Sequence, residues 1–171
     1  NNTVKALEVS KNALAQFPEN DVIKFTNARC LLANELYSES LKELENTVIL
    51  PNEGAQGGRI PYRLAAIMES IMFYRDGKVD EALVSVEKAK IWPENLGVGR
   101  PYNVDDRIEQ FLEAEYLLKK NQKDKSDELF KEIVSYTENN HRRYSSTDYL
   151  YIVSLKKLGM NSKAGEFLTK W

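Results

Sequence analysis

A strip of small residues that recurs along the chain places the strongest constraint on its fold. In segment 79–91, Ala82, Val86 and Ala89 are spaced four and three residues apart, so they share one face of a helix. Two of the three are alanine, which lets a second helix approach closely. The preceding Asp76-Gly77 predicts a turn, and Pro93 predicts a stop because proline lacks an N–H and clashes with the preceding turn. The stretch therefore predicts a helix–turn–helix unit.

The same four-then-three spacing occurs five times along the chain. Its first small residues are separated by 34, 42, 44 and 38 residues: Ala6, Ser40, Ala82, Ser126 and Ala164. Apolar periodicity between and within these strips predicts helices at 3–16, 21–34, 39–50, 61–75, 79–91, 104–120, 124–137 and 147–158, with a last helix that stops at Trp171. The chain is therefore predicted to be all-α, with about nine helices.

Polar residues before three of these helices are predicted to cap them. Ser38 precedes the helix at 39–50, and Asn103 precedes the helix at 104–120. Ser145 or Ser146 precedes the helix at 147–158. A side-chain oxygen at such a position can accept a hydrogen bond from a free N–H of the first turn. These residues thus predict where each helix begins.

Turn, small-residue strip and proline stop together resemble the tetratricopeptide repeat (TPR), a helix–turn–helix unit of about 34 residues. The resemblance implies a right-handed superhelix of antiparallel helix pairs over 1–171, a single domain with repeats at approximately 1–20, 21–52, 61–94, 104–138 and 145–171. Since the pattern begins and ends inside repeats, we expect a fragment of a longer protein. The segment PENLGVGRPY at 93–102 also resembles one in large bacterial proteins that place a carbohydrate-type β-sandwich domain before such repeats.

Composition and motifs favour binding over catalysis. The net charge of −2 gives no reason to expect nucleic acid as a partner, and no apolar run approaches the length of about 18 residues that membrane insertion needs. One cysteine, Cys30, excludes an internal disulfide, and the lone histidine, His141, lies in a polar loop. No nucleophile-elbow, phosphate-loop or metal-ligand spacing is present. We expect a protein that is not an enzyme and needs no cofactor or metal; its compartment stays open.

The TPR resemblance implies a concave groove lined by the first helix of each pair. Such grooves hold a protein, a peptide or another domain of the same parent chain. The candidate groove residues are Phe25, Arg29, Ile67, Ile71, Tyr74, Phe111, Glu115, Tyr149 and Lys156. Members that clamp a peptide C-terminus use Lys and Asn at places that are apolar here, so an amphipathic helix is the expected ligand. The alternative is that these side chains pack on one another.

Three arginine–tyrosine pairs near helix starts define a second candidate site. Their tyrosines are 40 and 42 residues apart, so stacked repeats would align them along one edge: Arg59 with Tyr62, Arg100 with Tyr102 and Arg143 with Tyr144. Free N–H groups at a helix start and an arginine fork can receive a carboxylate, a phosphate or sugar hydroxyls. A glycan- or anion-binding module of a carbohydrate-active parent is thus the alternative function. The bland alternative is packing of each tyrosine and a salt bridge from each arginine. Weak self-association through the terminal repeats is a third possibility.

Overall fold

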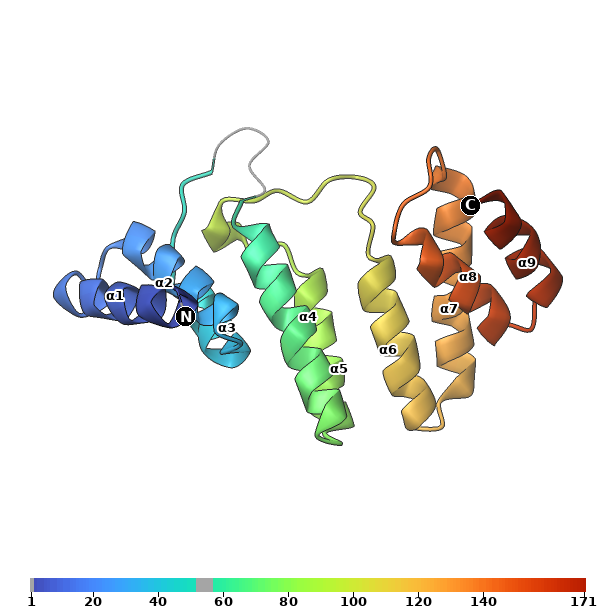
Figure 1. Ribbon diagram of the computed structural model, residues 1–171, viewed down its shortest axis with the longest axis horizontal. Coiled ribbons are helices and arrows are strands. Elements are labelled where there is room, and N and C mark those ends of the chain that lie inside the picture. The colour runs from blue at the N-terminus through green and yellow to red at the C-terminus, as the bar shows by residue number, and fades with distance from the viewer. Residues whose placement is uncertain (1, 52–56) are drawn as a thin grey trace.

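The computed structural model describes residues 2–51 and 57–171, and helices are the only regular structure in these two ranges. There the prediction of an all-α chain with about nine helices is confirmed. Figure 1 shows the elements, which are α1 (Asn2–Gln16), α2 (Asp21–Ala33), α3 (Tyr37–Glu45), α4 (Arg59–Arg75), α5 (Val79–Lys90), the short 3-10 helix η1 (Glu94–Leu96), α6 (Arg107–Lys119), α7 (Lys123–Asn140), α8 (Asp148–Lys157) and α9 (Asn161–Lys170).

The helices follow one another across the molecule in chain order (Figure 1). Each helix contacts the one before and the one after it, and the alternate helices α2, α4, α6 and α8 also contact each other in succession. A three-residue turn at 76–78 joins α4 to α5, and Gly77 takes the positive φ of 78° that glycine adopts without steric cost. We call α2, α4, α6 and α8 the first helices, and α3, α5, α7 and α9 the second helices.

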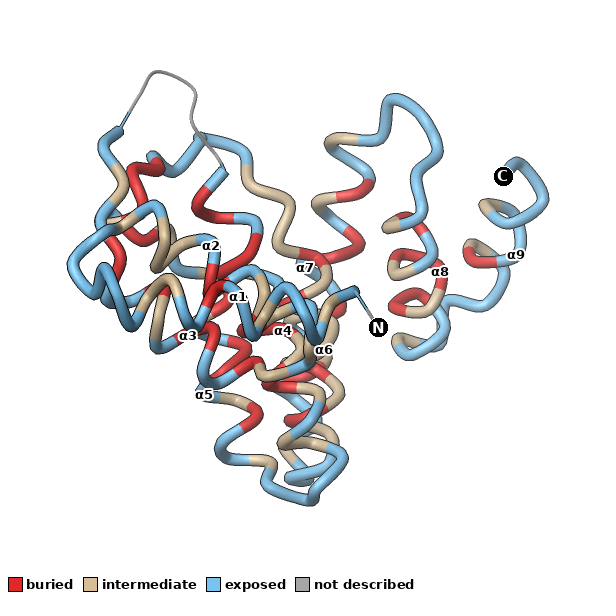
Figure 2. The backbone as a smooth tube through the Cα atoms, turned by 60° about the vertical axis from the view of Figure 1, so that its left-hand side comes forward, coloured by how far each residue is buried: buried red, intermediate tan, exposed pale blue. Residues whose placement is uncertain are grey.

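The predicted small-residue strip lies where helices meet. Ser40, Ala82, Ser126 and Ala164, one on each second helix, are completely buried. Figure 2 shows that buried residues concentrate on the sides of helices that face their neighbours. The fifth member, Ala6 on α1, is exposed. The first residue of the strip is therefore buried on all four second helices, where a small side chain leaves room for the neighbouring backbone.

The cap prediction for Ser38 is wrong. Helix α3 begins at Tyr37 and Leu36 holds the cap position, so Ser38 already lies inside the helix. Its hydroxyl donates a hydrogen bond to the carboxylate of Glu69 on α4, at 2.5 Å. The helix also ends at Glu45, short of the predicted 50. Ser38 therefore hydrogen-bonds to a buried carboxylate on the next hairpin and does not cap its own helix, although the local sequence predicts a cap.

The other two cap predictions fail in a similar way. Helix α6 begins at Arg107 rather than 104, and the side-chain amide of Asn103 donates to the amide oxygen of Asn140 at 2.6 Å. Before α8, the carboxylate of Asp148 accepts the backbone N–H of Ser145 at 2.9 Å. Here the first helical residue reaches back to the loop, whereas the sequence predicted that a loop serine would reach forward to the helix.

The segment PENLG at 93–97 ties the hairpin α4/α5 to the hairpin before it. The side-chain amide of Asn95 donates to the carbonyl oxygens of Leu44 (2.9 Å) and Thr47 (2.8 Å), which lie at and beyond the end of α3. The carbonyl of Asn95 accepts the N–H of Ile49 at 2.7 Å. Gly97 has φ 67°, and a Cβ there would lie 2.7 Å from the carbonyl oxygen of Ile49. This segment, which carried the weaker sequence resemblance, has a structural role here.

Close approach at the strip can be tested by enlarging one alanine. Ala82 packs with Val86 and Tyr116, so Ala82→Leu should lower the free energy of unfolding by about 1–3 kcal/mol through overpacking. Ala6→Leu is the matched control, because Ala6 has the same place in the pattern but is exposed; its effect should stay within about 0.5 kcal/mol. Urea denaturation followed by circular dichroism measures both. Equal losses would show that the strip does not set helix spacing.

Candidate functional site

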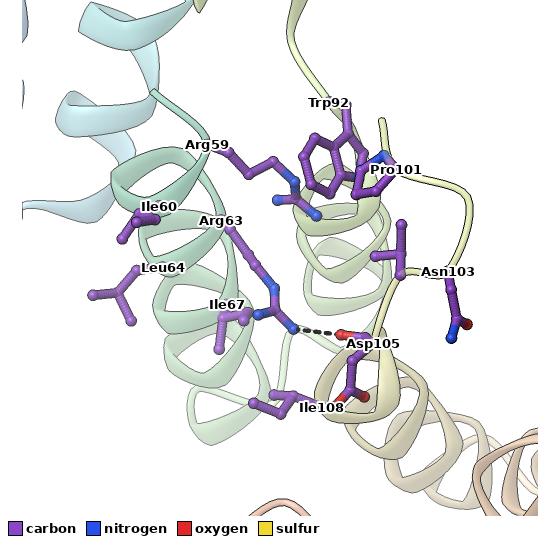
Figure 3. Close-up of a pocket in the computed structure, with 11 residues that line it drawn as sticks. Arg59, Ile60, Arg63, Leu64, Ile67, Trp92, Pro101, Asn103, Asp105 and Ile108 are labelled. Carbon is purple, nitrogen blue, oxygen red and sulfur yellow. Dashed lines mark hydrogen bonds between the residues drawn. The ribbon is translucent and has the colours of Figure 1, made fainter. Parts of the chain in front are cut away.

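A cleft of about 550 Å³ lies between the starts of α4 and α6. Figure 3 shows that α4 forms one side of it, and the chain that leads into α6 forms the other. The cleft has apolar walls and a polar end. The walls come from Ile60, Leu64, Ile67 and Ile108, and the polar end from Arg59, Arg63, Trp92, Asn103 and Asp105.

Helical spacing explains how α4 supplies both kinds of side chain. Arg59 and Arg63 are four residues apart, so they lie on the same face of the helix. Both reach toward the α6 side of the cleft in Figure 3. Ile60, Leu64 and Ile67 are spaced by four and three residues and form an adjoining stripe. One helix therefore presents a cationic row beside an apolar row.

Arg63 is fully engaged with α6. Its Nη2 donates to Oε2 of Glu109 at 2.6 Å and to the backbone carbonyl of Asp105 at 3.2 Å, and its Nε donates to Oε1 of Glu109. The Glu109 side chain is completely buried. The hydrogen bond with Glu109 is the main cause that raises the pKa of Arg63 above its ordinary value. This two-pronged charge pair joins α4 to α6 and leaves Arg63 little capacity for a ligand.

Within the described residues, Arg59 has no such partner. Only 4% of the residue is exposed, and its guanidinium carbon lies 4.5 Å from the centre of the Trp92 indole ring. None of its three guanidinium nitrogens makes a hydrogen bond to any group in the described part of the chain, and the same holds for the indole nitrogen of Trp92. Burial, followed by the positive charge of Arg63, lowers the pKa of Arg59 below its ordinary value. A charged group with unused donors therefore lines the cleft.

Arg107 is an internal comparison, because it also is the first residue of a first helix. It is equally buried, at 6% exposed, and its guanidinium carbon lies 5.2 Å from the ring centre of Tyr136. It differs in its partners, which accept hydrogen bonds of 2.7–3.0 Å and are Asp105, Thr137, Thr147 and Asp148. The hydrogen bond with Asp105 is the main cause that raises the pKa of Arg107. Both arginines therefore lie against an aromatic ring, but in the described chain only Arg107 has hydrogen-bond acceptors. We call the Arg107 site closed and the Arg59 site open.

The position of one carboxylate accounts for part of the difference. Asp148, which binds Arg107 at 2.8 Å, is the first residue of α8. At the start of α6 the first residue is Arg107 itself, and the nearest carboxylate, Asp106, precedes the helix. Asp106 makes no hydrogen bond to Arg59, and its Oδ1 is buried without a partner in the described chain. Burial is the main cause that raises the pKa of Asp106.

Several predicted groove residues have packing partners instead of open faces. The ring of Tyr74 stacks on Tyr116 with centroids 4.7 Å apart, and Phe111 packs on Phe130 at 5.9 Å. Phe25 and Ile71 are partly buried against a core cluster that α2, α3 and α4 share with Ala89 and Leu96, and Glu115 forms an ion pair with Lys157 at 2.5 Å. The remaining candidates divide between the cleft, which Ile67 lines, and the exposed surface, which holds Arg29, Tyr149 and Lys156.

The predicted arginine–tyrosine edge is not uniform. Arg59 and Tyr62 belong to α4 and are both buried, although the sequence placed them in a loop at the edge. Arg100 and Tyr102 lie in the connection before α6 and are exposed. The first two pairs therefore have opposite environments, because α4 starts two residues earlier than the predicted 61.

The third pair has a different environment again. Arg143 is exposed, while the ring of Tyr144 meets those of His141 (4.7 Å) and Phe167 (5.5 Å) edge-on. Nδ1 of His141 lies 3.4 Å from the carboxylate of Asp148. His141, which the sequence placed in a polar loop, is exposed, and its ring also contacts Tyr144 and Phe167 of α9.

Sequence reasoning missed Arg63, Trp92, Glu109 and Arg107 as members of the cleft and its surroundings. Arg63 follows Arg59 by four residues, which is a helical spacing, but the predicted helix began at 61 and so left Arg59 outside it. Glu109 lies 46 residues beyond Arg63 and Trp92 lies in a connection, so neither has a local pattern that indicates the contact. Only packing of α4 against α6 brings these side chains together.

Comparison of the chain with protein-family models, with curated proteins and with solved structures found no match. Within residues 2–51 and 57–171, no group of three or more His, Cys, Asp or Glu side chains is placed to hold a metal ion. In the same residues, every helix is too short or too polar to cross a bilayer. The chemistry of the cleft is therefore inferred from its own side chains: a buried cation with unused donors, an indole face and apolar walls.

The two buried arginines should respond differently to replacement. Arg107→Met removes the partner of two carboxylates, Asp105 and Asp148, and should cost about 3–5 kcal/mol of unfolding free energy. Arg59→Met breaks no hydrogen bond or ion pair within the described chain, and it removes a buried charge while retaining an apolar contact with Trp92. Its effect should be within about 1 kcal/mol and can be stabilising. Urea denaturation of both variants measures the difference; similar large losses would show that Arg59 is paired in solution.

Acid should weaken the closed arginine site. Burial alone would raise the pKa of Asp148, but hydrogen bonds from Arg107 and from the N–H of Ser145 bring it below its ordinary value. A lowered folded-state pKa adds stability above the unfolded-state value of about 3.9, and this stability is lost as pH falls through the folded-state pKa. The unfolding free energy should therefore fall below about pH 4. Urea midpoints at a series of pH values should fall less steeply for Asp148→Asn than for the unmodified chain, and equal slopes would contradict the assignment.

Proposed function

We propose that this protein is a non-catalytic helical-repeat scaffold, with TPR-like helix pairs wound into a right-handed superhelix, that binds a protein or peptide. Two findings support the proposal. Helices follow one another in chain order and contact their neighbours, and successive first helices also contact each other. The first small residue of the strip is buried on each second helix. Both features are typical of stacked helix-pair repeats, whose partners bind along one face of the stack.

The single observation that carries the binding proposal is the open cleft between α4 and α6. Its volume of about 550 Å³ is within the range of ligand-binding pockets. Two of its apolar wall residues keep much of their surface in solvent, Ile60 at 65% and Leu64 at 45%. Apolar side chains that line a cavity while remaining exposed are typical of a surface that a partner covers.

The shape and chemistry of the cleft indicate the kind of partner. An amphipathic segment could place an apolar side chain against Leu64 and Ile67 and keep its polar face toward solvent. Tyr149 on α8, another first helix, is exposed at 57% of its surface and offers a separate apolar contact. The partner could be a separate protein or another domain of the same parent chain, since both would offer such a segment.

A glycan- or anion-binding module remains the alternative function. Arg100 and Tyr102 favour it, because both side chains are exposed in the same connection and a free tyrosine ring offers a stacking face. Against it, the other two arginine–tyrosine pairs differ in environment, so the aligned edge that motivated this function lacks its regular repeat. We therefore favour the scaffold.

Charge substitutions on the first helices test the scaffold proposal. Peptides selected from a random display library on the unmodified chain should bind Leu64→Glu or Tyr149→Glu at least about tenfold more weakly, because each change places a charge on an apolar contact. Val84→Glu on α5 is the matched control, since Val84 is equally exposed but lies on a second helix. Phe111 is unsuitable because it packs on Phe130. Equal binding by all three variants, with folding verified by circular dichroism, would remove the first-helix surface from consideration.

A further inference from the structure

We propose that Arg59 and Trp92, at the polar end of the cleft, form a recognition site for a single carboxylate attached to an apolar group. The inference deepens the proposed function, and rests on it for the source of the carboxylate, which we assign to an acidic side chain of the bound partner. The binding chemistry itself follows from the cleft. A free aliphatic carboxylate is the second possible source, and comparison of a peptide with a small fatty acid distinguishes it from a partner side chain.

Unused donors on Arg59 are the first argument. A guanidinium carries five N–H donors in one plane, and a buried charge is normally paired and hydrogen-bonded. The indole of Trp92 lies against the guanidinium, but an aromatic face accepts none of these in-plane hydrogen bonds in the structure. A buried charged donor without an acceptor has lost its hydrogen bonds to water and gained none in return, which costs free energy. A ligand that supplies acceptors in the guanidinium plane therefore gains binding energy that a solvent-exposed arginine would not offer.

The closed arginine of the next hairpin shows which acceptor suits this arrangement. Arg107, stacked on Tyr136, receives carboxylate oxygens from Asp105 and Asp148 at 2.7–2.8 Å. Arg59, stacked on Trp92, has the same helix position and the same kind of aromatic neighbour. The protein thus contains a filled example of the site, and in that example the main acceptors are carboxylates.

Neighbouring charges favour one negative charge on the ligand over two. The positive charge of Arg63 is already matched by Glu109. The charge of Asp105 is likewise matched by Arg107, whereas Asp106 is close enough to influence the pKa of Arg59, so Asp106 would repel a dianion such as phosphate more than a monoanion. Arg59 lacks a hydrogen-bonded acceptor within the described residues; a monocarboxylate supplies one with a single negative charge, and its two oxygens fit the guanidinium fork.

The walls require an apolar group next to that carboxylate. Leu64, Ile67 and Ile108 line the part of the cleft beyond the arginines. On the other side of the cleft the exposed residues Pro101 and Asn103 lie next to solvent, which leaves a way in for a chain end or a side chain. A glutamate with apolar neighbours in a peptide has this combination of groups, and so does a short branched fatty acid.

The experiment titrates small probes onto the chain with Trp171→Phe, so that fluorescence reports on Trp92, the other tryptophan of the sequence. The probes are 4-methylpentanoate, the neutral 4-methylpentanamide, inorganic phosphate, and capped peptides Leu-Glu-Leu and Leu-Gln-Leu. We expect saturable changes with the carboxylate and with the Glu peptide, and affinities at least about tenfold weaker for the amide, the Gln peptide and phosphate. Tighter binding of the Glu peptide than of 4-methylpentanoate assigns the site to a partner side chain; the reverse assigns it to a free carboxylate.

Three variants control the result. Arg59→Met should abolish saturable binding, whereas Arg100→Ala, which removes an exposed arginine nearby, should leave it unchanged. Asp106→Asn should strengthen binding several-fold by removing a competing negative charge. Equal binding of acid and amide, retention in Arg59→Met, or binding that appears only in Asp106→Asn would each overturn the inference; the last would mean that Asp106 occupies Arg59. The two proposals can fail separately. If the carboxylate probes bind as expected but Leu64→Glu still binds the selected peptides, the result contradicts the scaffold proposal and leaves the carboxylate site in place.

Discussion

Buried charge pairs between successive first helices are the interactions on which the arrangement depends. Arg63 on α4 donates two hydrogen bonds to the fully buried Glu109 on α6, and Arg107 on α6 binds Asp148 on α8. Breaking either pair would strand a charge in the interior, which costs far more than losing an exposed salt bridge. Each pair therefore opposes rotation or sliding of one hairpin against the next, and so holds the walls of the cleft between α4 and α6 in place.

Against this background, Arg59 is the exception that gives the cleft its chemistry. Like Arg107 it is buried against an aromatic ring, but no acceptor in the described part of the chain hydrogen-bonds to it. A structural arginine is expected to be paired, as Arg63 and Arg107 are. An unpaired one contributes little to folding and leaves donors for another molecule, so the same residue type serves cohesion at one hairpin junction and is available for recognition at the neighbouring one.

Much of the fold could be predicted from local patterns. The spacing of Ala82, Val86 and Ala89 predicted a buried helix face, and all three are completely buried. Helix starts were predicted less well, because Ser38 and Asn103 hydrogen-bond to side chains of other helices instead of capping their own. The site was predicted least: Arg59 was named for a loop edge, and Trp92 was not named at all. A pattern within one helix indicates which face is buried, but it carries no information on the distant residue that meets that face.

The sequence by itself determined the all-α class, the succession of helix–turn–helix units and the positions of close helix contact, because helical periodicity, glycine, proline and small side chains act within a few residues. Only the tertiary structure decided which charged groups are paired. Arg59 and Arg107 look alike in sequence, as arginines near predicted helix starts. Asp148 closes Arg107 from 41 residues away, whereas Asp106 precedes its helix and leaves Arg59 open. Electrostatic pairing of buried groups depends on distances between helices, and those distances exist only once the hairpins have packed.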